Sequence, residues 1–167
     1  ELIDFFGAQR DIKEKRIRVL HALSFVEDPS RILRAVRFEQ RYGFSLGKQT
    51  LSLVHAAVKS GLLGNIPGRR LSYEIRQILS EDDPLQGFER LRELGVLAAI
   101  HPDLIFNAAI KENFARVRQT ISWFNLLYTH EDFRSWFIYL LALIEHMKPK
   151  KIIDICSRLG LTDENVR

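Results

Sequence analysis

Residues 28–43 carry the punctuation of one complete helix, and this feature constrains the fold more than any other in the sequence. Asp28 suits the N-cap, Pro29 fits the first helical position, and Gly43 suits the left-handed residue that follows a helix end. At about 100° per residue, the apolar side chains between these signals fall on one face. That face consists of Ile32, Ala35, Val36, Phe38 and Tyr42. The segment therefore predicts an amphipathic helix over residues 29–42 that packs on other helices.

The remaining apolar residues mostly follow the same helical spacing. We expect further helices over residues 49–59, 69–80, 84–94, 108–127 and 131–146. Residues 16–19 alternate polar and apolar side chains and could form a short strand. Trp123 and Trp136 have no basic residues interleaved with them, so we expect both to pack in the core. The sequence thus predicts an all-α fold, a bundle of many helices with at most a short N-terminal strand.

Composition excludes several classes of protein. With 167 residues, of which 46% are hydrophobic, the chain can bury about two thirds of its unfolded surface and so build a real core. No uncharged apolar run reaches about 18 residues, so we expect no membrane span. The single Cys156 cannot form an internal disulfide, which favours the reducing cytoplasm. The five histidines lack the spacing of zinc ligands, so we expect no metal site in this chain.

Asp28 and Arg31 bring a carboxylate and a guanidinium side by side at the start of the predicted helix. A carboxylate only accepts hydrogen bonds, and a guanidinium only donates them. Cytosine and adenine each offer an amino donor beside a ring-nitrogen acceptor, whereas guanine and uracil offer a carbonyl beside an N–H donor. The pair would therefore favour C and A. The simpler interpretation is an N-cap with an intrahelical ion pair, which contributes only a few tenths of a kcal/mol.

Positive charge is concentrated in the first half of the chain. Residues 1–80 contain 14 Lys and Arg against 8 Asp and Glu, whereas residues 81–167 contain 11 against 13. Neutralisation of phosphates dominates the affinity of proteins for nucleic acids. The candidate phosphate ligands are Arg34, Arg37, Arg41, Lys48, Arg69, Arg70 and Arg76. We therefore expect RNA contact on this half, and the alternative is an ordinary solvated helix face.

Four motifs together resemble the bacterial (class II) tRNA nucleotidyltransferase and poly(A) polymerase family. Residues 27–38 read EDPSRILRAVRF, which resembles the Glu-Asp-x-x-Arg signature of that family. Residues 2–18 are similar to the hinge segment that leads out of its catalytic head. Residues 70–75 (RLSYEI) are similar to its Glu-Arg-Ile-x-x-Glu-Leu motif, and residues 101–104 (HPDL) to the Pro-Glu-Leu that follows. The order and spacing of the motifs also fit, over roughly the first two thirds of the chain.

This resemblance implies roles for individual residues. In that family the Asp and Arg of the signature form the protein template that selects incoming CTP or ATP, which corresponds to Asp28 and Arg31 here. Arg34 matches a further arginine that lies near the nucleotide. The motif positions to which we assign a structural role are Glu27, Arg70 and Glu74. The family usually carries Glu at the position of Arg69, so any ion pair of that Glu is absent or reversed here.

The resemblance also implies what this chain lacks. The family holds Mg²⁺ with an Asp-x-Asp pair in its catalytic head, because nucleotidyl transfer needs metal ions that bridge the attacking and leaving oxygens. No Asp-x-Asp occurs in the sequence, and Asp82-Asp83 reads as a helix start before Pro84. We therefore expect a fragment, cut at both ends, that is inactive by itself because its head lies upstream. The strand expected over residues 16–19 would be a remnant of that head.

The resemblance further predicts how the chain is divided. We expect a hinge segment over residues 1–26, which leads from the head, and a neck over residues 27–95, which selects the nucleotide and binds RNA. A helical body, truncated at its C-terminus, would occupy residues 96–167. Outside the first two thirds of the chain, only the helical character matches the family.

Three functions remain open at this point. The first is the nucleotide-selecting and RNA-binding portion of a template-independent nucleotidyltransferase that adds C, A or both to tRNA 3′ ends, with CTP and ATP as substrates. The second is a poly(A) polymerase, because the same pair admits adenine. The third is a helical RNA-binding module without catalysis. The sequence is compatible with CCA-adding, CC-adding, A-adding and poly(A) activity alike, because the head or the RNA decides how many nucleotides are added.

Overall fold

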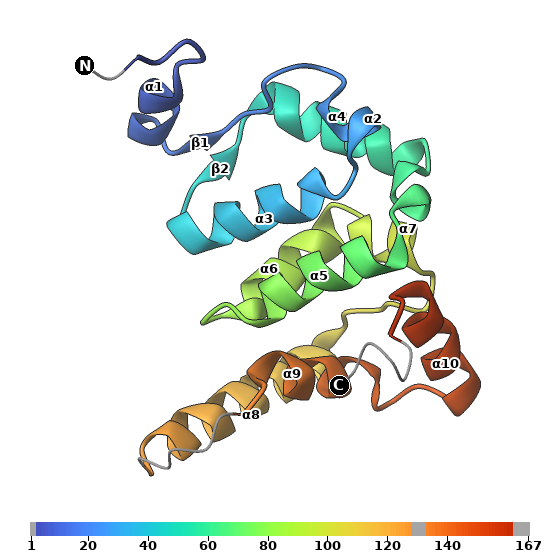
Figure 1. Cartoon of the computed structure of the whole chain (residues 1–167). Coiled ribbons are helices and arrows are strands. Elements are labelled where there is room, and N and C mark those ends of the chain that lie inside the picture. The colour runs from blue at the N-terminus through green and yellow to red at the C-terminus, as the bar shows by residue number, and fades with distance from the viewer. Residues whose placement is uncertain (1–2, 128–132, 162–167) are drawn as a thin grey trace.

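The computed structural model describes residues 3–127 and 133–161, and in these residues the fold is helical (Figure 1). The helices are α1 (Ala8–Lys13), α2 (Ser24–Glu27), α3 (Arg31–Tyr42), α4 (Lys48–Lys59), α5 (Gly68–Leu79), α6 (Pro84–Glu93), α7 (Val96–Ile100), α8 (Ala108–Asn125), α9 (Ser135–Ile144) and α10 (Pro149–Arg158). A 3₁₀ helix, η1 (Leu62–Asn65), joins α4 to α5. The prediction of an all-α fold is confirmed.

The strand expected near the N-terminus is real but shorter than predicted. Strand β1 (Arg16–Ile17) pairs in parallel with β2 (Ser45–Leu46), with Arg16 opposite Ser45 and Ile17 opposite Leu46. The strand therefore spans two residues instead of four. Its partner comes from this chain, directly after α3, so the strand does not depend on a sheet in a separate head.

Helix α3 ends where the sequence predicted and begins two residues later. Gly43 follows it in the left-handed conformation (φ 61°), which is strained for residues with a side chain. The N–H groups of Arg31 and Ile32 each bond a carbonyl three residues earlier, at 3.1 Å, so the chain at Pro29 forms a tight turn before the regular helix. The first turn of the predicted helix is thus replaced by this tighter turn.

Figure 1 shows the helices in three tiers, with α3 in the upper half of the molecule. The β1–β2 pair and α4 lie above α3, and α5 and α6 lie below it, where both helices contact α3. The third tier contains α8, α9 and α10, and α9 contacts both α8 and α5. Helix α5 is therefore packed between α3 on one side and the last helices on the other.

One hydrophobic cluster connects the tiers, from Phe25 to Leu159. Its largest members are fully buried aromatic rings. Phe114 of α8 lies 5.5 Å from Phe88 of α6 and 5.1 Å from Tyr139 of α9, measured between ring centroids. Burial of a Phe side chain stabilises a fold by about 1.5–3 kcal/mol. These rings therefore hold the third tier on the second.

The other helix predictions are mostly confirmed. Helices α4, α5, α6, α8 and α9 match expected segments within a few residues, although residues 131–132 of the last segment lie outside the described part. Helices α1, α2, α7 and α10 were not predicted. In the described ranges no helix combines the length and the apolar character that crossing a membrane requires.

One of the two tryptophan expectations is wrong. Trp123 on α8 is 60% exposed and does not belong to the core. Trp136 on α9 is partly buried and packs against the core, as expected. Only Ile110 and Phe114 of α8 are buried. Helical spacing therefore did not identify which face of α8 packs against the core.

Candidate nucleotide-selecting site

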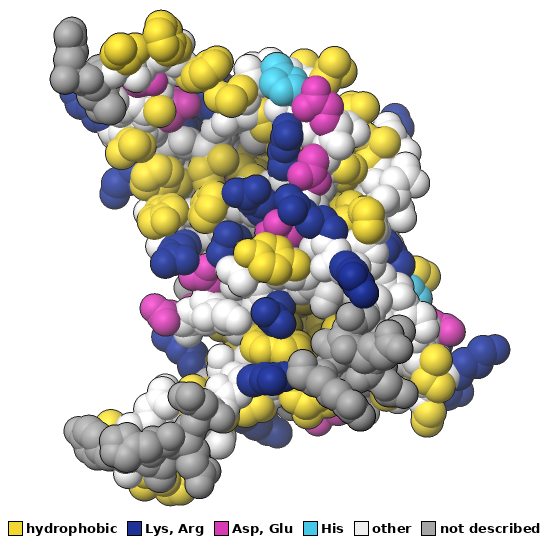
Figure 2. Space-filling model, viewed as in Figure 1, with side chains coloured by type: hydrophobic (Ala, Val, Ile, Leu, Met, Phe, Trp, Pro, Cys, Tyr) yellow, Lys and Arg dark blue, Asp and Glu magenta, His cyan; other side chains and the backbone are white. Residues whose placement is uncertain are grey.

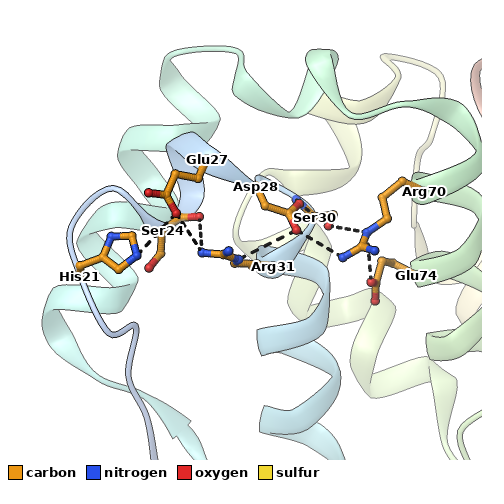
Figure 3. A network of polar contacts seen from close by, with 8 residues as sticks. All are labelled: His21, Ser24, Glu27, Asp28, Ser30, Arg31, Arg70 and Glu74. Atoms are coloured by element: carbon orange, nitrogen blue, oxygen red, sulfur yellow. Dashed lines mark hydrogen bonds and ion pairs between the residues drawn. The ribbon is translucent and has the colours of Figure 1, made fainter. Parts of the chain in front are cut away.

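Asp28 lies in the turn between α2 and α3, and neighbouring groups fix its carboxylate (Figure 3). The backbone is extended there (φ −145°, ψ 91°). Oδ1 of Asp28 accepts a hydrogen bond from the backbone N–H of Ser30 at 3.0 Å and a second one from the Ser30 hydroxyl. This bond to the N–H two residues later closes a local turn, whereas α3 begins at Arg31 with Ser30 at its N-cap position, so the prediction of Asp28 as the N-cap is wrong. Since Ser30 is fully buried, this oxygen of the carboxylate has a fixed position.

The second partner of Asp28 comes from α5, 42 residues further along the chain. Nη2 of Arg70 donates to Oδ2 of Asp28 at 3.2 Å, and Nε of Arg70 donates to the Ser30 hydroxyl oxygen at 3.0 Å. Figure 3 shows the guanidinium of Arg70 between Asp28 and Glu74. The structural role predicted for Arg70 thus includes a direct contact with the candidate base-reading carboxylate. Spacing along the sequence contains no signal for such a contact between two helices.

Glu74 contacts the Arg70 guanidinium on the side away from Asp28. One carboxylate oxygen of Glu74 lies 3.7 Å from Nε of Arg70, which precedes it by four residues on the same helix. The side chain of Glu74 is only 2% exposed. Burial raises the pKa of the Glu74 carboxyl, and the nearby guanidinium groups of Arg34 and Arg70 oppose that rise. The network therefore runs from a buried carboxylate through Arg70 to Asp28.

Arg31 stands next to Asp28 and is held mainly from its other side. Nη1 of Arg31 donates to the carbonyl oxygen of Ser24 at 3.3 Å and to a carboxylate oxygen of Glu27 at 3.4 Å. Glu27 also lies 3.5 Å from Nε2 of His21. The distance from Nε of Arg31 to Oδ2 of Asp28 is 3.9 Å, so this expected ion pair is looser than the contact with Glu27. Glu27 therefore contacts both Arg31 and His21, and its structural role stays a prediction.

The arrangement leaves a donor and an acceptor side by side at the surface. The side chain of Arg31 is 42% exposed and that of Asp28 is 31% exposed. Among the described residues, no hydrogen bond engages Nη2 of Arg31. A carboxylate oxygen can accept more than one hydrogen bond, so Oδ2 of Asp28 retains capacity beside its bond from Arg70. Together the two side chains can pair with a planar partner that has a donor next to an acceptor.

Five of the seven candidate phosphate ligands fall into two groups. Arg34, Lys48 and Arg69 are exposed, and in residues 3–127 and 133–161 no ion pair neutralises them. Arg37, by contrast, is only 13% exposed and donates to the side-chain oxygen of Gln77 at 3.1 Å. The paired residues are Arg37 and Arg41, which lie 3.6 Å and 3.5 Å from the carboxylate of Glu81. The sequence grouped all of these cations together, and the packing separates them.

No group of three or more His, Cys, Asp or Glu side chains that could hold a metal ion occurs in the part of the chain that the structure describes. Asp83 stands at the N-cap position of α6, as predicted, with Pro84 after it. Its carboxylate pairs with Arg118 at 2.8 Å and accepts from the side-chain amide of Gln86 at 3.3 Å. Oδ2 of Asp83 is therefore engaged by two neighbouring side chains.

Comparison with known proteins agrees with the motifs. The family described as the probable RNA- and SrmB-binding site of polymerase A matches residues 43–106. An A-adding tRNA nucleotidyltransferase of Geobacter sulfurreducens is 45% identical over 162 residues, which are 97% of this chain and 18% of that protein. An A-adding tRNA nucleotidyltransferase of Aquifex aeolicus is 41% identical over 146 residues, which are 87% of this chain and 18% of that protein.

Solved structures agree as well. A CCA-adding enzyme with ATP is 34% identical with a TM-score of 0.84, over 98% of this chain and 39% of that one. The Thermotoga maritima CCA-adding enzyme complexed with tRNA is also 34% identical with a TM-score of 0.84, over 98% of this chain and 40% of that one. The chain spans less than half the length of these relatives. In sequence and in fold, it matches the neck and body region of the bacterial tRNA nucleotidyltransferase and poly(A) polymerase family.

Proposed function

We propose that this chain is the nucleotide-selecting and RNA-binding portion of a template-independent nucleotidyltransferase that adds C, A or both to tRNA 3′ ends. The observation that carries the proposal is the carboxylate of Asp28, which Ser30 and Arg70 hold beside the exposed guanidinium of Arg31. The relatives named as A-adding and CCA-adding enzymes support the same reaction. The substrates are CTP, ATP or both, and the RNA partner is a tRNA.

Selection follows from the hydrogen-bonding capacity of the pair. Asp28 accepts from the exocyclic amino group of cytosine or adenine, and Arg31 donates to the adjacent ring nitrogen. Guanine or uracil would place its carbonyl against the Asp28 carboxylate, so that two acceptors face each other, and its N–H against Arg31, so that two donors do. These polar groups would remain unpaired. A site built to hydrogen-bond one edge discriminates strongly for this reason. Arg34, one turn further along α3, is proposed to lie near the same nucleotide.

The structural residues of the motif keep this edge in place. Arg70 restrains one oxygen of Asp28, and Ser30 restrains the other. Preorganisation of this kind lowers the cost of ordering side chains when the base binds. Glu27 on the other side orients Arg31.

Nucleotidyl transfer itself is assigned to the longer enzyme that contains this chain. Mg²⁺ would supply the stabilisation of the attacking and leaving oxygens there, and this chain alone is proposed to be inactive. The described residues offer it no fitting set of ligands. We propose the cytoplasm as the site of the enzyme. The division into a hinge over residues 1–26, a neck over 27–95 and a body over 96–167 stays a prediction.

A gel assay tests the reaction. The chain is expressed together with its upstream region and is given tRNA that ends before CCA or at CC, and the added nucleotides are read on a sequencing gel. Addition of CCA, of a single A or of a long A tract would identify a CCA-adding enzyme, an A-adding enzyme or a poly(A) polymerase. The match to a polymerase A family keeps the last possibility in the test. RNA binding without any addition would contradict the proposal and leave a non-catalytic binding module.

A further inference from the structure

The outward face of α5 carries an exposed aromatic residue between two arginines. Arg69, Tyr73 and Arg76 are spaced i, i+4 and i+7, so they lie on one side of the helix. Tyr73 is 51% exposed, although the buried face of α5 is well packed. Figure 2 shows Lys and Arg side chains gathered over the middle of this face of the molecule, around α3 and α5. Tyr73 therefore lies in a basic region of the surface.

A second aromatic ring from the next tier completes this surface. The guanidinium of Arg76 lies over the ring of Trp136 from α9, with Cζ 5.3 Å from the ring centroid. Trp136 is partly buried against the core, so its ring has a fixed orientation. The cation is attracted to the face of the ring, and this attraction positions the guanidinium. We call Arg69, Tyr73, Arg76 and Trp136 the α5 strip.

The α5 strip borders a small hollow. The cavity has a volume of about 200 Å³ and extends from Arg69 and Tyr73 to Trp136 and Gly160. Its far wall is held by direct contact between two backbones, because a Cβ at Gly68 would lie only 2.9 Å from the backbone N of Gly160. Binding pockets for drug-sized ligands usually measure about 300–1,000 Å³. The hollow therefore suits one ring system better than a whole nucleotide.

The charge around this hollow differs from that around a larger cavity. None of the described residues that line the hollow is acidic. The larger cavity, of about 540 Å³, also touches two arginines, Arg37 and Arg41, but Glu81, Asp82 and Asp83 line it as well. A polyanion is attracted to the first and repelled from the acidic side of the second. The α5 strip is thus the better candidate for nucleic acid.

We propose that the α5 strip binds an unpaired nucleotide of the RNA substrate, with the base stacked on Tyr73 and the flanking phosphates neutralised by Arg69 and Arg76. This inference rests on the proposed function, because it places the RNA next to the nucleotide-selecting site. Tyr73 follows Arg70 by three residues, which is about 4.5 Å along the helix axis. Since Arg70 bonds Asp28, an RNA strand on the strip would lie beside the selected base.

Binding of RNA to the chain tests this site without any catalytic step. The probe is a fluorescent RNA hairpin with a short single-stranded 3′ end, compared with the same hairpin made blunt. Replacement of a stacked aromatic residue by Ala costs about 5- to 100-fold in affinity. We expect a loss of that size for Tyr73→Ala with the overhang, little loss for Tyr73→Phe, and little difference between the variants with the blunt hairpin.

The chain offers a matched control in Tyr42. This tyrosine on α3 is 55% exposed, similar to Tyr73, and lies beside Arg41 at the other end of the basic region. Tyr42→Ala should therefore leave the affinity within about twofold of the original value. Thermal unfolding of each variant checks that the chain is folded.

Fluorescence of Trp136 provides a second measurement. In a Trp123→Phe background, Trp136 is the remaining tryptophan of the sequence. Binding of the RNA with the overhang should change the fluorescence emission of Trp136, and Arg76→Ala should reduce that change. Unchanged RNA affinity in Tyr73→Ala would overturn the inference, and a protein partner would then be the better explanation for the exposed ring. That result would leave the choice of C and A intact, so it would not count against the proposed function.

Discussion

The two ends of α3 use the same residue types in opposite ways. At the N-terminal end, Arg31 is 42% exposed, and its contacts with Glu27 and Asp28 are 3.4 Å and 3.9 Å long. Towards the C-terminal end, Arg37 is 13% exposed and is bound to Gln77, and Arg41, although 51% exposed, shares the carboxylate of Glu81 with it. The first end therefore keeps hydrogen-bonding capacity for a ligand, whereas the second uses its charges to hold helices together.

Glu39 shows the C-terminal pattern most clearly. Its buried carboxylate accepts from Nε of Arg90 on α6 at 2.8 Å and from the backbone N–H of Leu46 in β2 at 2.9 Å. The hydrogen bond to Glu39 raises the pKa of the Arg90 guanidinium above its usual value. One side chain thus joins α3 to both neighbouring tiers. The two ends differ because burial and ion pairing, more than the number of arginines, decide which arginines can bind a substrate.

The largest effect on stability is expected at Glu39. Glu39→Ala leaves Arg90 without its buried partner, and breaking such a pair costs about 3 kcal/mol or more. Urea unfolding measures this loss. Glu93→Ala removes the exposed partner of the same arginine and should cost less than about 1 kcal/mol. Equal losses for the two variants would contradict the structural role of the buried contact.

RNA binding should separate the two groups of arginines. Arg34→Ala with Arg69→Ala removes exposed cations that form no ion pair with a described carboxylate, so affinity should fall and the salt dependence should weaken by about 0.7–0.9 per lost phosphate contact. Arg37→Ala with Arg41→Ala should change the salt dependence less, since these two residues already share an ion pair with Glu81. Titration of a tRNA acceptor hairpin at several salt concentrations measures both. The opposite order would show that the ion pairs with Glu81 open when RNA binds.

A smaller effect concerns the pH dependence of stability. Because burial raises the pKa of Glu74 above its ordinary value of 4.5, the folded state binds this proton more tightly than the unfolded state. The contribution of Glu74 is therefore most favourable below that value and decreases as pH rises through the raised pKa. Glu74→Gln removes this titration. The free energy of unfolding of the Glu74→Gln variant, minus that of the original chain, should increase as pH rises from 4.5 through the raised pKa of Glu74. A difference that does not change with pH would contradict the raised pKa.

Local features of this fold could be predicted from the sequence. The end of α3 at Gly43 and the local turn that Asp28 closes depend on residues a few positions apart, so their signals are complete within the segment. The same reason made Asp28 and Arg31 recognisable as neighbours. The order of the family motifs added the prediction that this pair selects the base, whereas helix chemistry alone predicts an ordinary cap.

Contacts between distant segments could not be predicted. Arg70 reaches Asp28 from 42 residues away, and Glu81 is 44 positions from Arg37. Strand β2 is only two residues long, and its pairing with β1 depends on where α3 ends. Each of these contacts is decided by how the helices pack, which the helical period does not encode. The same limit explains why the sequence did not predict the contact between the guanidinium of Arg76 on α5 and the ring of Trp136 on α9.

Arg31 and Asp28 are proposed to select the base, and the choice of nucleotide by the longer enzyme that carries this chain measures this selection. Incorporation of CTP, ATP, GTP and UTP into tRNA is compared for Arg31→Ala and for Arg41→Ala, a similarly exposed arginine at the other end of α3. Loss of a hydrogen bond from a charged group should reduce the preference for C and A over G and U by about 10- to 100-fold in Arg31→Ala. Arg41→Ala should keep the preference. An unchanged preference in a folded Arg31→Ala enzyme would contradict the account.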